Sequence, residues 1–274
     1  MNTNSNSPIG IYDSGIGGLT VLKTLIEQLP NEQFVYFADT ANLPYGNKTP
    51  EQITEFSHNI ISWFQNTVKT KMVIAACHTS SAIALKDIAT GFEIPVIGTI
   101  YPMLQKLLDS QHKNIGIIAT PASVQSRIHE NIFKAHGFAG KIVSISCPNF
   151  VPLIEAEQLD LTSLDSHAEE YLAHFKAEEL DTLIFGCTHY PLIRTHISKF
   201  LPDHVKYIDP AEHITSDVVN FLTSNKLLNS SHEKLLPQFF CSKDNDAFAV
   251  KLRKILNIES SVGLHLPHSF LIKA

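Results

Sequence analysis

Two similar stretches, Met72-Val73-Ile74-Ala75-Ala76-Cys77-His78-Thr79 and Leu183-Ile184-Phe185-Gly186-Cys187-Thr188-His189, indicate the architecture of the chain. In each of them a short apolar run ends at a cysteine and is followed by small polar residues. Such runs are typical of buried strands in a parallel sheet. Ligands bind outside the carboxyl ends of these strands, where both thiols would project. We therefore expect one site that is served by a thiol from each of two strands.

A repeat relates two halves of the chain. Ile115-Gly116-Ile117-Ile118 corresponds to Ile9-Gly10-Ile11-Tyr12, and the strand-like run at 141–146 corresponds to the run at 34–38. The offset grows from 106 residues, between Ile9 and Ile115, to 110 residues, between Cys77 and Cys187. Because the features keep their order, we expect two related units.

Strand-like runs alternate with helical patterns, which favours an α/β architecture with parallel sheets. The predicted fold is two pseudo-symmetric α/β domains with mainly parallel sheets, facing each other across a central active-site cleft. The first domain is predicted to contain residues 1–97 and 209–274, and the second to contain 98–208. Helices are expected over 51–67 and 212–228, a late strand at 239–241 and a last helix over 247–256.

Composition excludes several classes of protein. The 274 residues carry a formal net charge of -6, so the chain has no basic footprint for nucleic acid. No apolar run approaches the roughly 20 residues of a membrane span. The polar start lacks the features of a signal peptide, and four cysteines do not suggest a disulfide framework. We expect a cytoplasmic protein with reduced thiols and no membrane partner.

Asp13-Ser14-Gly15-Ile16-Gly17-Gly18 lies between a predicted strand and a predicted helix. Glycines let the backbone approach an anion, and a helix N-terminus offers free N–H groups to a carboxylate or phosphate. The motif matches neither the dinucleotide-binding fingerprint nor the P-loop. An anion-binding turn and a simple tight turn with Asp13 as its cap both remain open.

The two cysteines are candidates for chemistry. A thiol where a strand enters a helix has its thiolate favoured by the helix dipole, and His78 and His189 could pair with the thiolates. The alternative is that each cysteine is a small buried hydrophobe, which is how we interpret Cys147 and Cys241. Recurrence at equivalent positions favours a function.

Zinc is a rival for two cysteines and two histidines. Adjacent residues such as Cys77 and His78 point in opposite directions in an extended segment, so no metal is predicted. Pro44-Tyr45-Gly46 is a rigid turn that presents an aromatic hydroxyl, and Glu155 could be an acid, a base or a thiol partner. Taken alone, an ordinary loop and a solvated glutamate are the better explanations.

The chain resembles the cofactor-independent aspartate/glutamate racemase superfamily, and within it the glutamate racemases. Five motifs carry the resemblance, which extends from about Ile9 to the final helix. They are Asp13-Ser14-Gly15-Ile16-Gly17-Gly18, Pro44-Tyr45-Gly46, Cys77-His78-Thr79-Ser80-Ser81-Ala82, Phe150-Val151-Pro152-Leu153-Ile154-Glu155 and Gly186-Cys187-Thr188-His189-Tyr190-Pro191-Leu192.

The resemblance implies an isomerase that interconverts L- and D-glutamate without a cofactor and supplies D-glutamate for peptidoglycan. It implies that Cys77 and Cys187 are two acid/base thiols, with Asp13 near Cys77, and His189 and Glu155 on the side of Cys187. A homodimer is left open. The implied substrate-binding residues are Asp13, Ser14, Pro44, Tyr45, Gly46, His78, Thr79, Thr120, Ser123, Thr188 and His189.

One motif departs from the family pattern. The superfamily motif is Cys-Asn-Thr, whereas this chain has Cys77-His78-Thr79. Histidine is bulkier than asparagine and titrates near neutral pH, so substrate choice and pH dependence stay open. The alternatives are an aspartate or other amino-acid racemase, a single-cysteine decarboxylase or isomerase, and a catalytically silent amino-acid binding protein.

Overall fold

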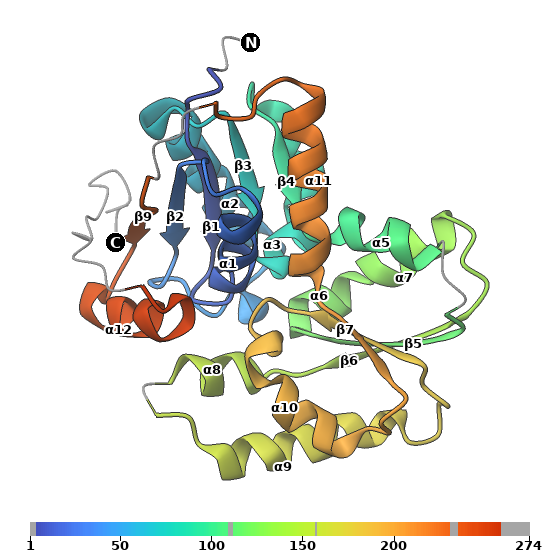
Figure 1. The fold of residues 1–274 in the computed structure, drawn as a ribbon. Helices are drawn as coiled ribbons and strands as arrows, with labels where there is room; N and C mark the ends of the chain where they lie inside the picture. Colours follow the sequence, from blue (N-terminus) through green and yellow to red (C-terminus); the bar gives the residue numbers. More distant parts are fainter. Residues whose placement is uncertain (1–3, 109–111, 157, 231–234, 259–274) are drawn as a thin grey trace.

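The computed structural model describes residues 4–108, 112–156, 158–230 and 235–258. These residues form two parallel sheets, each covered by helices on both faces (Figure 1). The predicted α/β class with two parallel-sheet units is therefore confirmed. Within these ranges, no helix combines the length and the apolar character that crossing a membrane requires.

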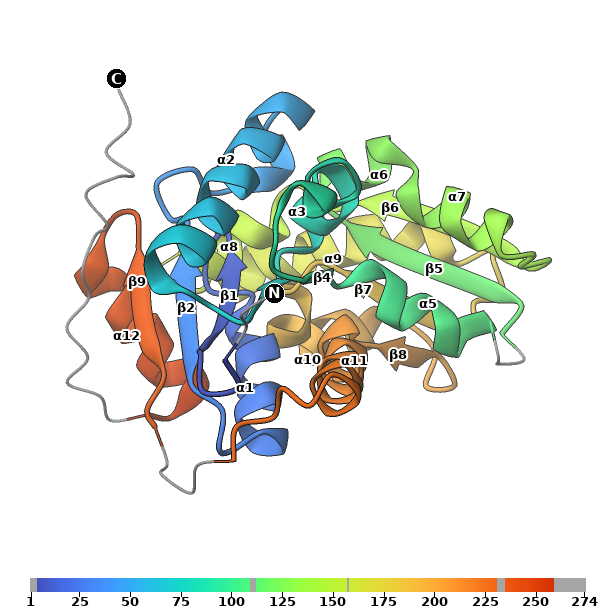
Figure 2. The ribbon, with the colours of Figure 1, turned by 90° about the horizontal axis from the view of Figure 1, so that it is seen from above.

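The first sheet has five strands, all parallel to their neighbours, and seen from above it occupies the side of the molecule that carries α12 (Figure 2). Its order is β4 (Val96–Gly98), β3 (Met72–Ala75), β1 (Ile9–Asp13), β2 (Phe34–Ala38) and β9 (Gln238–Cys241). The neighbouring strands β1 and β3 end at Asp13 and at Ala75, two residues before Cys77. The side chains of Asp13 and Cys77 therefore reach the same edge of the sheet.

Alternate residues of these strands belong to two apolar cores, as the period-2 geometry of a strand requires. One core lies beneath α1 (Leu19–Gln28), α11 (Pro210–Ser224) and α12 (Asn245–Leu256). The other lies beneath α2 (Pro50–Trp63), α3 (His78–Ile83) and α4 (Leu85–Ile88). The C-terminal helices therefore pack on the first sheet, although they follow the second one in the chain.

The second sheet repeats the topology of the first. Its order is β8 (Lys206–Ile208), β7 (Thr182–Gly186), β5 (Asn114–Ala119) and β6 (Lys141–Ser146), again all parallel. In both sheets the first strand of the repeat pairs with its second and third strands, and the third pairs with the fourth. Cys187 follows β7 as Cys77 follows β3, which confirms the structural equivalence of the two cysteines.

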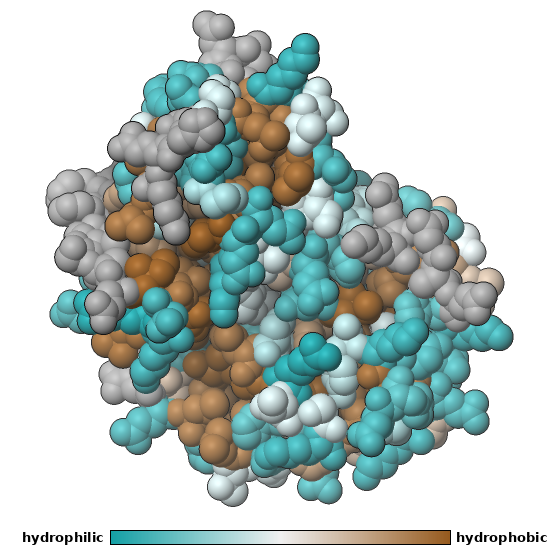
Figure 3. Space-filling view, viewed as in Figure 1, coloured by the Kyte–Doolittle hydropathy of each residue, from teal (hydrophilic) through white to brown (hydrophobic). Residues whose placement is uncertain are grey.

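Helices also cover both faces of the second sheet. One face packs against α8 (Phe150–Glu155), α9 (Leu161–Leu172) and α10 (Arg194–Ile197). The opposite face packs against α5 (Ile100–Leu108) and α7 (Ile128–Ala135), while α6 (Pro121–Ser126) follows β5 and packs against α3. On the face turned to the viewer in Figure 3, polar residues separate the apolar surface into several patches.

Two helices differ in detail from the predicted ones. The helix expected over 51–67 ends as α2 at Trp63 and continues as a π-helical turn, Phe64–Val68, which stops where Lys69 takes a left-handed conformation. The helix expected over 212–228 begins at Pro210 and ends at Ser224, close to Lys226, which is also left-handed. The apolar pattern continues beyond both α-helices because Phe64 and Leu227 still pack in a core, although Leu228 is exposed.

Candidate active site

A small cavity lies where the two halves meet, and both cysteines line it. Its free volume of about 10 Å³ is roughly what one water molecule needs. Of the predicted contact residues, Asp13 and Ser123 are not among its walls. The lining residues are Ser14, Pro44, Tyr45, Gly46, Cys77, His78, Thr79, Thr120, Val151, Cys187, Thr188 and His189.

Cys77 lies at the N-terminus of α3 and is almost fully buried. Its Sγ is 3.9 Å from the hydroxyl oxygen of Ser14. Burial, reinforced by the negative charge of Asp13, raises the pKa of the Cys77 thiol to about 12. Without substrate, Cys77 therefore holds its proton.

Cys187 has a histidine partner. Sγ of Cys187 is 3.7 Å from Nδ1 of His189, and Nε2 of the same ring is 2.8 Å from Oε1 of Glu155. Burial lowers the pKa of His189, but its hydrogen bonds to Cys187 and Glu155 raise it more, leaving it well above its ordinary value. His189 is therefore an imidazolium that faces the thiol with an N–H donor.

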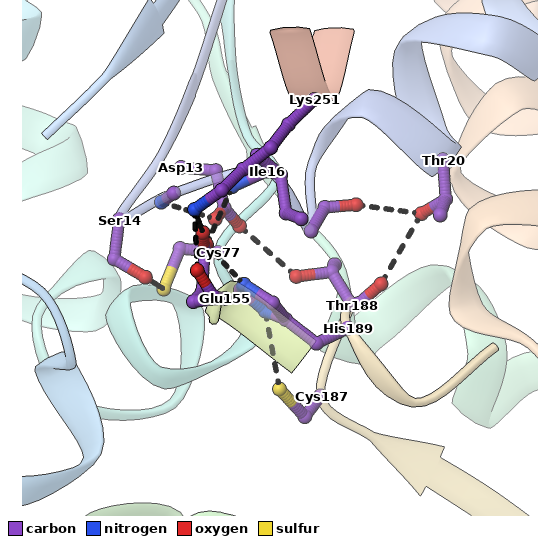
Figure 4. Close-up of polar contacts among 12 residues, drawn as sticks. Asp13, Ser14, Ile16, Thr20, Cys77, Glu155, Cys187, Thr188, His189 and Lys251 are labelled. Atoms are coloured by element: carbon purple, nitrogen blue, oxygen red, sulfur yellow. Dashed lines mark hydrogen bonds and ion pairs between the residues drawn. The ribbon is translucent and has the colours of Figure 1, made fainter. Parts of the chain in front are cut away.

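Glu155 reaches the first half of the molecule, where the Gly-rich turn binds it (Figure 4). The N–H of Ile16 donates to Oε1 of Glu155 over 2.9 Å, and Nζ of Lys251 lies 3.0 Å from Oε2. Burial raises the pKa of Glu155, but His189, Ile16 and Lys251 together lower it to about 2. Glu155 is therefore a buried carboxylate, not a solvated one.

This contact answers the question left open for the Gly-rich turn. It is a tight turn in which Asp13 caps the N–H of Gly15, and it also binds a carboxylate of the chain itself, that of Glu155, through the N–H of Ile16. A Cβ atom at Gly15 would collide with this carboxylate, and one at Gly17 would collide with His189 and Thr188. The glycines therefore make room for side chains from the other half.

Asp13 also bridges the two halves. Its Oδ1 accepts a hydrogen bond from the N–H of Gly15 over 2.8 Å, and its Oδ2 accepts one from the hydroxyl of Thr188 over 3.0 Å. Burial raises the pKa of Asp13, although the charge of His189 and these hydrogen bonds oppose the increase. Asp13 thus fixes the loop that carries Cys187 and is also near enough to raise the pKa of Cys77.

A chain of three hydroxyl groups crosses the interface on the other side of the cavity. Thr79 and Thr120 share a hydrogen bond of 2.9 Å, and Thr120 and Ser123 share one of 3.0 Å. Ser123 therefore holds Thr120, which lines the cavity, instead of lining it directly.

The idea that His78 pairs with a thiolate is wrong. Its Nε2 is 2.7 Å from Nε2 of His129, and its Nδ1 is 2.9 Å from the hydroxyl of Thr99. Burial lowers the pKa of both histidines, to about 4 for His129 and well below the usual value for His78. His78 is the first residue of α3, and its ring lies between packed helices, where it contacts His129 on α7 of the second half.

The hydroxyl of Tyr45 bonds within the first half of the molecule. It donates a hydrogen bond of 2.6 Å to Oδ2 of Asp39, and both groups are buried. The aromatic ring and Gly46 still form part of the cavity wall. Asp39 was missed, although it follows its strand as Asp13 ends β1, which was a usable signal.

Metal binding has no evident site in the part of the chain that the structure describes, where no three His, Cys, Asp or Glu side chains are arranged to hold an ion. The rings of His78 and His189 have other partners, so the zinc alternative lacks the ligand set that it requires.

Comparison with known proteins identifies the family. The profile of the Asp/Glu/Hydantoin racemase family matches residues 10–217, which is most of the chain and includes both cysteines. The chain belongs to this racemase family. As a member of the family it is an isomerase.

Individual members of the racemase family are similar over nearly the whole chain. A glutamate racemase from Trichodesmium erythraeum is 42% identical over 226 residues, 82% of each chain. The crystal structure of glutamate racemase isoform RacE1 from Bacillus anthracis has a TM-score of 0.88 at 30% identity, covering 96% of this chain and 98% of that one. Glutamate racemase from Francisella tularensis in complex with D-glutamate has a TM-score of 0.86 at 34% identity, with the same coverage.

Proposed function

We propose that this racemase interconverts L- and D-glutamate with Cys77 and Cys187 as its two acid/base groups, and that it supplies D-glutamate for peptidoglycan in the cytoplasm. The observation that carries the proposal is that one thiol from each half lines the same cavity. Relatives named glutamate racemase, similar in sequence and in structure, support the choice of substrate.

Racemisation requires a base on one face of the α-carbon and an acid on the other. In one direction, the thiolate of Cys187 takes the α-proton, and the electron pair of the broken C–H bond spreads into the α-carboxylate. The thiol of Cys77 then gives its proton to the opposite face of the carbon. The enzyme is left with a Cys187 thiol and a Cys77 thiolate, which is the state needed for the reverse direction.

The electrostatics of the site fit these roles. The imidazolium of His189 stabilises negative charge on Sγ of Cys187, whereas burial and Asp13 keep the proton on Cys77. The hydroxyls of Ser14, Thr79 and Thr120 line the cavity and can donate to charge that develops on the carboxylate, whereas the hydroxyl of Thr188 already donates to Asp13. The α-ammonium of the substrate brings a positive charge that would stabilise the Cys77 thiolate once it forms.

The two bases belong to two proposed domains, residues 1–97 with 209–274 and residues 98–208. In this division each domain contributes one thiol and one strand-end polar group, Asp13 or Thr120. Association of two chains into a homodimer remains a prediction from the resemblance.

Incubation of the purified enzyme with each enantiomer of glutamate in heavy water tests the proposal. We expect the circular dichroism signal to decay to zero whether the reaction starts from L- or from D-glutamate. Each inverted product should carry one deuterium at Cα. The same assay with aspartate and other amino acids tests the substrate. Glutamate binding without inversion or deuterium incorporation would instead indicate a silent binding protein.

A further inference from the structure

Lys251 approaches the site from the last helix of the described chain. It lies on α12, and 96 residues separate it from Glu155, the residue it contacts. Its ammonium group donates to the backbone carbonyl of Glu155 and to Oε2 of the same residue (Figure 4). The side chain of Lys251 is 21% exposed, whereas that of Glu155 is 6% exposed, so the contact closes off the outer side of the carboxylate.

The contact leads to a thiol through two further hydrogen bonds. Glu155 uses Oε1 to accept from Nε2 of His189 and from the N–H of Ile16, and the other nitrogen of the His189 ring faces Cys187. Lys251 binds Oε2 of Glu155, whereas His189 binds Oε1. Because it holds the backbone and the carboxylate of one residue together, it fixes the side-chain rotation that aims Oε1 at His189.

We propose that Lys251 is a positioning residue for the proton chemistry at Cys187, since it holds Glu155 where Glu155 can orient His189. The proposal rests on the proposed two-thiol function. Lys251 belongs to a helix that packs on the first sheet, whereas Glu155, His189 and Cys187 belong to the second half. The contact therefore completes the Cys187 side of the site with a group from the opposite half.

Removal of the lysine distinguishes a positioning role from a purely electrostatic one. The titratable groups around His189 are Cys187 on its own loop, Glu155 on α8 and Asp13 at the end of β1, with Lys251 behind Glu155. If only a positive charge were lost, the pKa of His189 would rise. If Glu155 loses its placement, the pKa of His189 falls, because burial then acts on an unpaired ring.

The test compares Lys251→Met and Lys251→Arg with Lys254→Met, which removes an exposed lysine from the same helix. Racemisation of both enantiomers is measured from pH 6 to pH 10. The protonation of His189 is followed by ¹⁵N NMR of histidine-labelled enzyme without substrate, its signals being assigned from their absence in His189→Asn. Melting temperatures are recorded for every variant, and Lys251→Gln replaces Lys251→Met if that variant does not fold.

For Lys251→Met we expect kcat to fall roughly tenfold to a hundredfold, a part of what a positioned acid or base contributes. KM should change less than kcat, and both the basic limb of the pH profile and the NMR titration of His189 should move to lower pH. Lys251→Arg should recover most of the activity, and Lys254→Met should match the parent enzyme.

Three results would overturn the proposal. They are parental kcat in Lys251→Met, a His189 titration that moves to higher pH, and lost activity with a lower melting temperature but an unchanged titration. The NMR titration needs no turnover. It therefore still tests the hold of Lys251 on His189 if the parent enzyme proves not to racemise glutamate, which would refute the proposed function alone.

Discussion

Cys77 and Cys187 occupy equivalent places in two sheets of the same topology, yet their surroundings differ. Cys187 has a direct histidine partner, which is held in turn by Glu155 and Lys251. Cys77 has the hydroxyl of Ser14 and the backbone and side chain of Ser80 close to its sulfur, and the histidine next to it in sequence bonds to His129 instead. The repeat has therefore conserved the position of the thiol but not the means of controlling its proton.

Removal of either thiol should have the largest effect on the racemisation rate. If both faces of the α-carbon need a group, Cys77→Ala and Cys187→Ala should each lower the racemisation rate by at least about a thousandfold, since neither thiol can serve both faces. Cys241→Ala is the matched control, because Cys241 is a buried cysteine on β9 that does not line the cavity. Circular dichroism with either enantiomer measures the rates. Activity within tenfold of the parent in either variant would refute the two-base assignment.

The second prediction concerns the opposite pH behaviour of the two sides. The pKa of His129 is lowered by burial from 6.5 to about 4. Between these two pH values His129 is protonated in the unfolded protein but not in the folded one, so the folded protein loses stability as pH falls through this window. The shift corresponds to roughly 3 kcal/mol of unfolding free energy. The pKa of His189 is raised, so its contribution is complete below the unfolded value and is lost as pH rises through the folded one.

Urea unfolding between pH 7 and pH 4 measures the acid-side effect. His129→Gln should remove much of the loss of stability on acidification, while its amide can still bond to His78. His174→Gln, a change at an exposed histidine, should leave the acid dependence as it is in the parent. An equal pH dependence in the parent and in His129→Gln would show that the buried pair does not titrate on unfolding.

The smallest expected effect is on catalysis in His78→Asn, which restores the superfamily motif. Because both ring nitrogens of His78 are directed at His129 and Thr99, we expect kcat to stay within about tenfold of the parent. Steady-state kinetics at pH 8 measures it. A loss above a hundredfold at unchanged KM would mean that His78 assists Cys77, and the contrast between the two sides would disappear.

The fold was predictable because its signals are local. The apolar runs that end at Cys77 and Cys187 became β3 and β7, and the repeat anticipated the matching strand orders. The resemblance also named residues that do meet around one cavity. Each apolar run and each motif can be found within a few consecutive residues, and the repeat only compares such runs between the two halves.

The partners of these residues were not predictable in the same way. His129 and Lys251 lie on helices whose apolar faces determine their place, and nothing in their own segments indicates the residue that each will contact. Both contacts cross between the halves, so they depend on how the two sheets pack together. The same docking turned the ring of His78 away from the thiol.

The small size of the cavity has a consequence for the catalytic cycle. A space for about one water molecule cannot admit an amino acid, so the walls of the cavity, which come from both halves, must move apart before substrate enters and again before product leaves. Each separation must stretch or break bridges such as Thr79 to Thr120, His78 to His129, Asp13 to Thr188 and Glu155 to Ile16. The turnover rate should therefore depend on solvent viscosity, because opening and closing of the interface, and not proton transfer alone, then limits the rate.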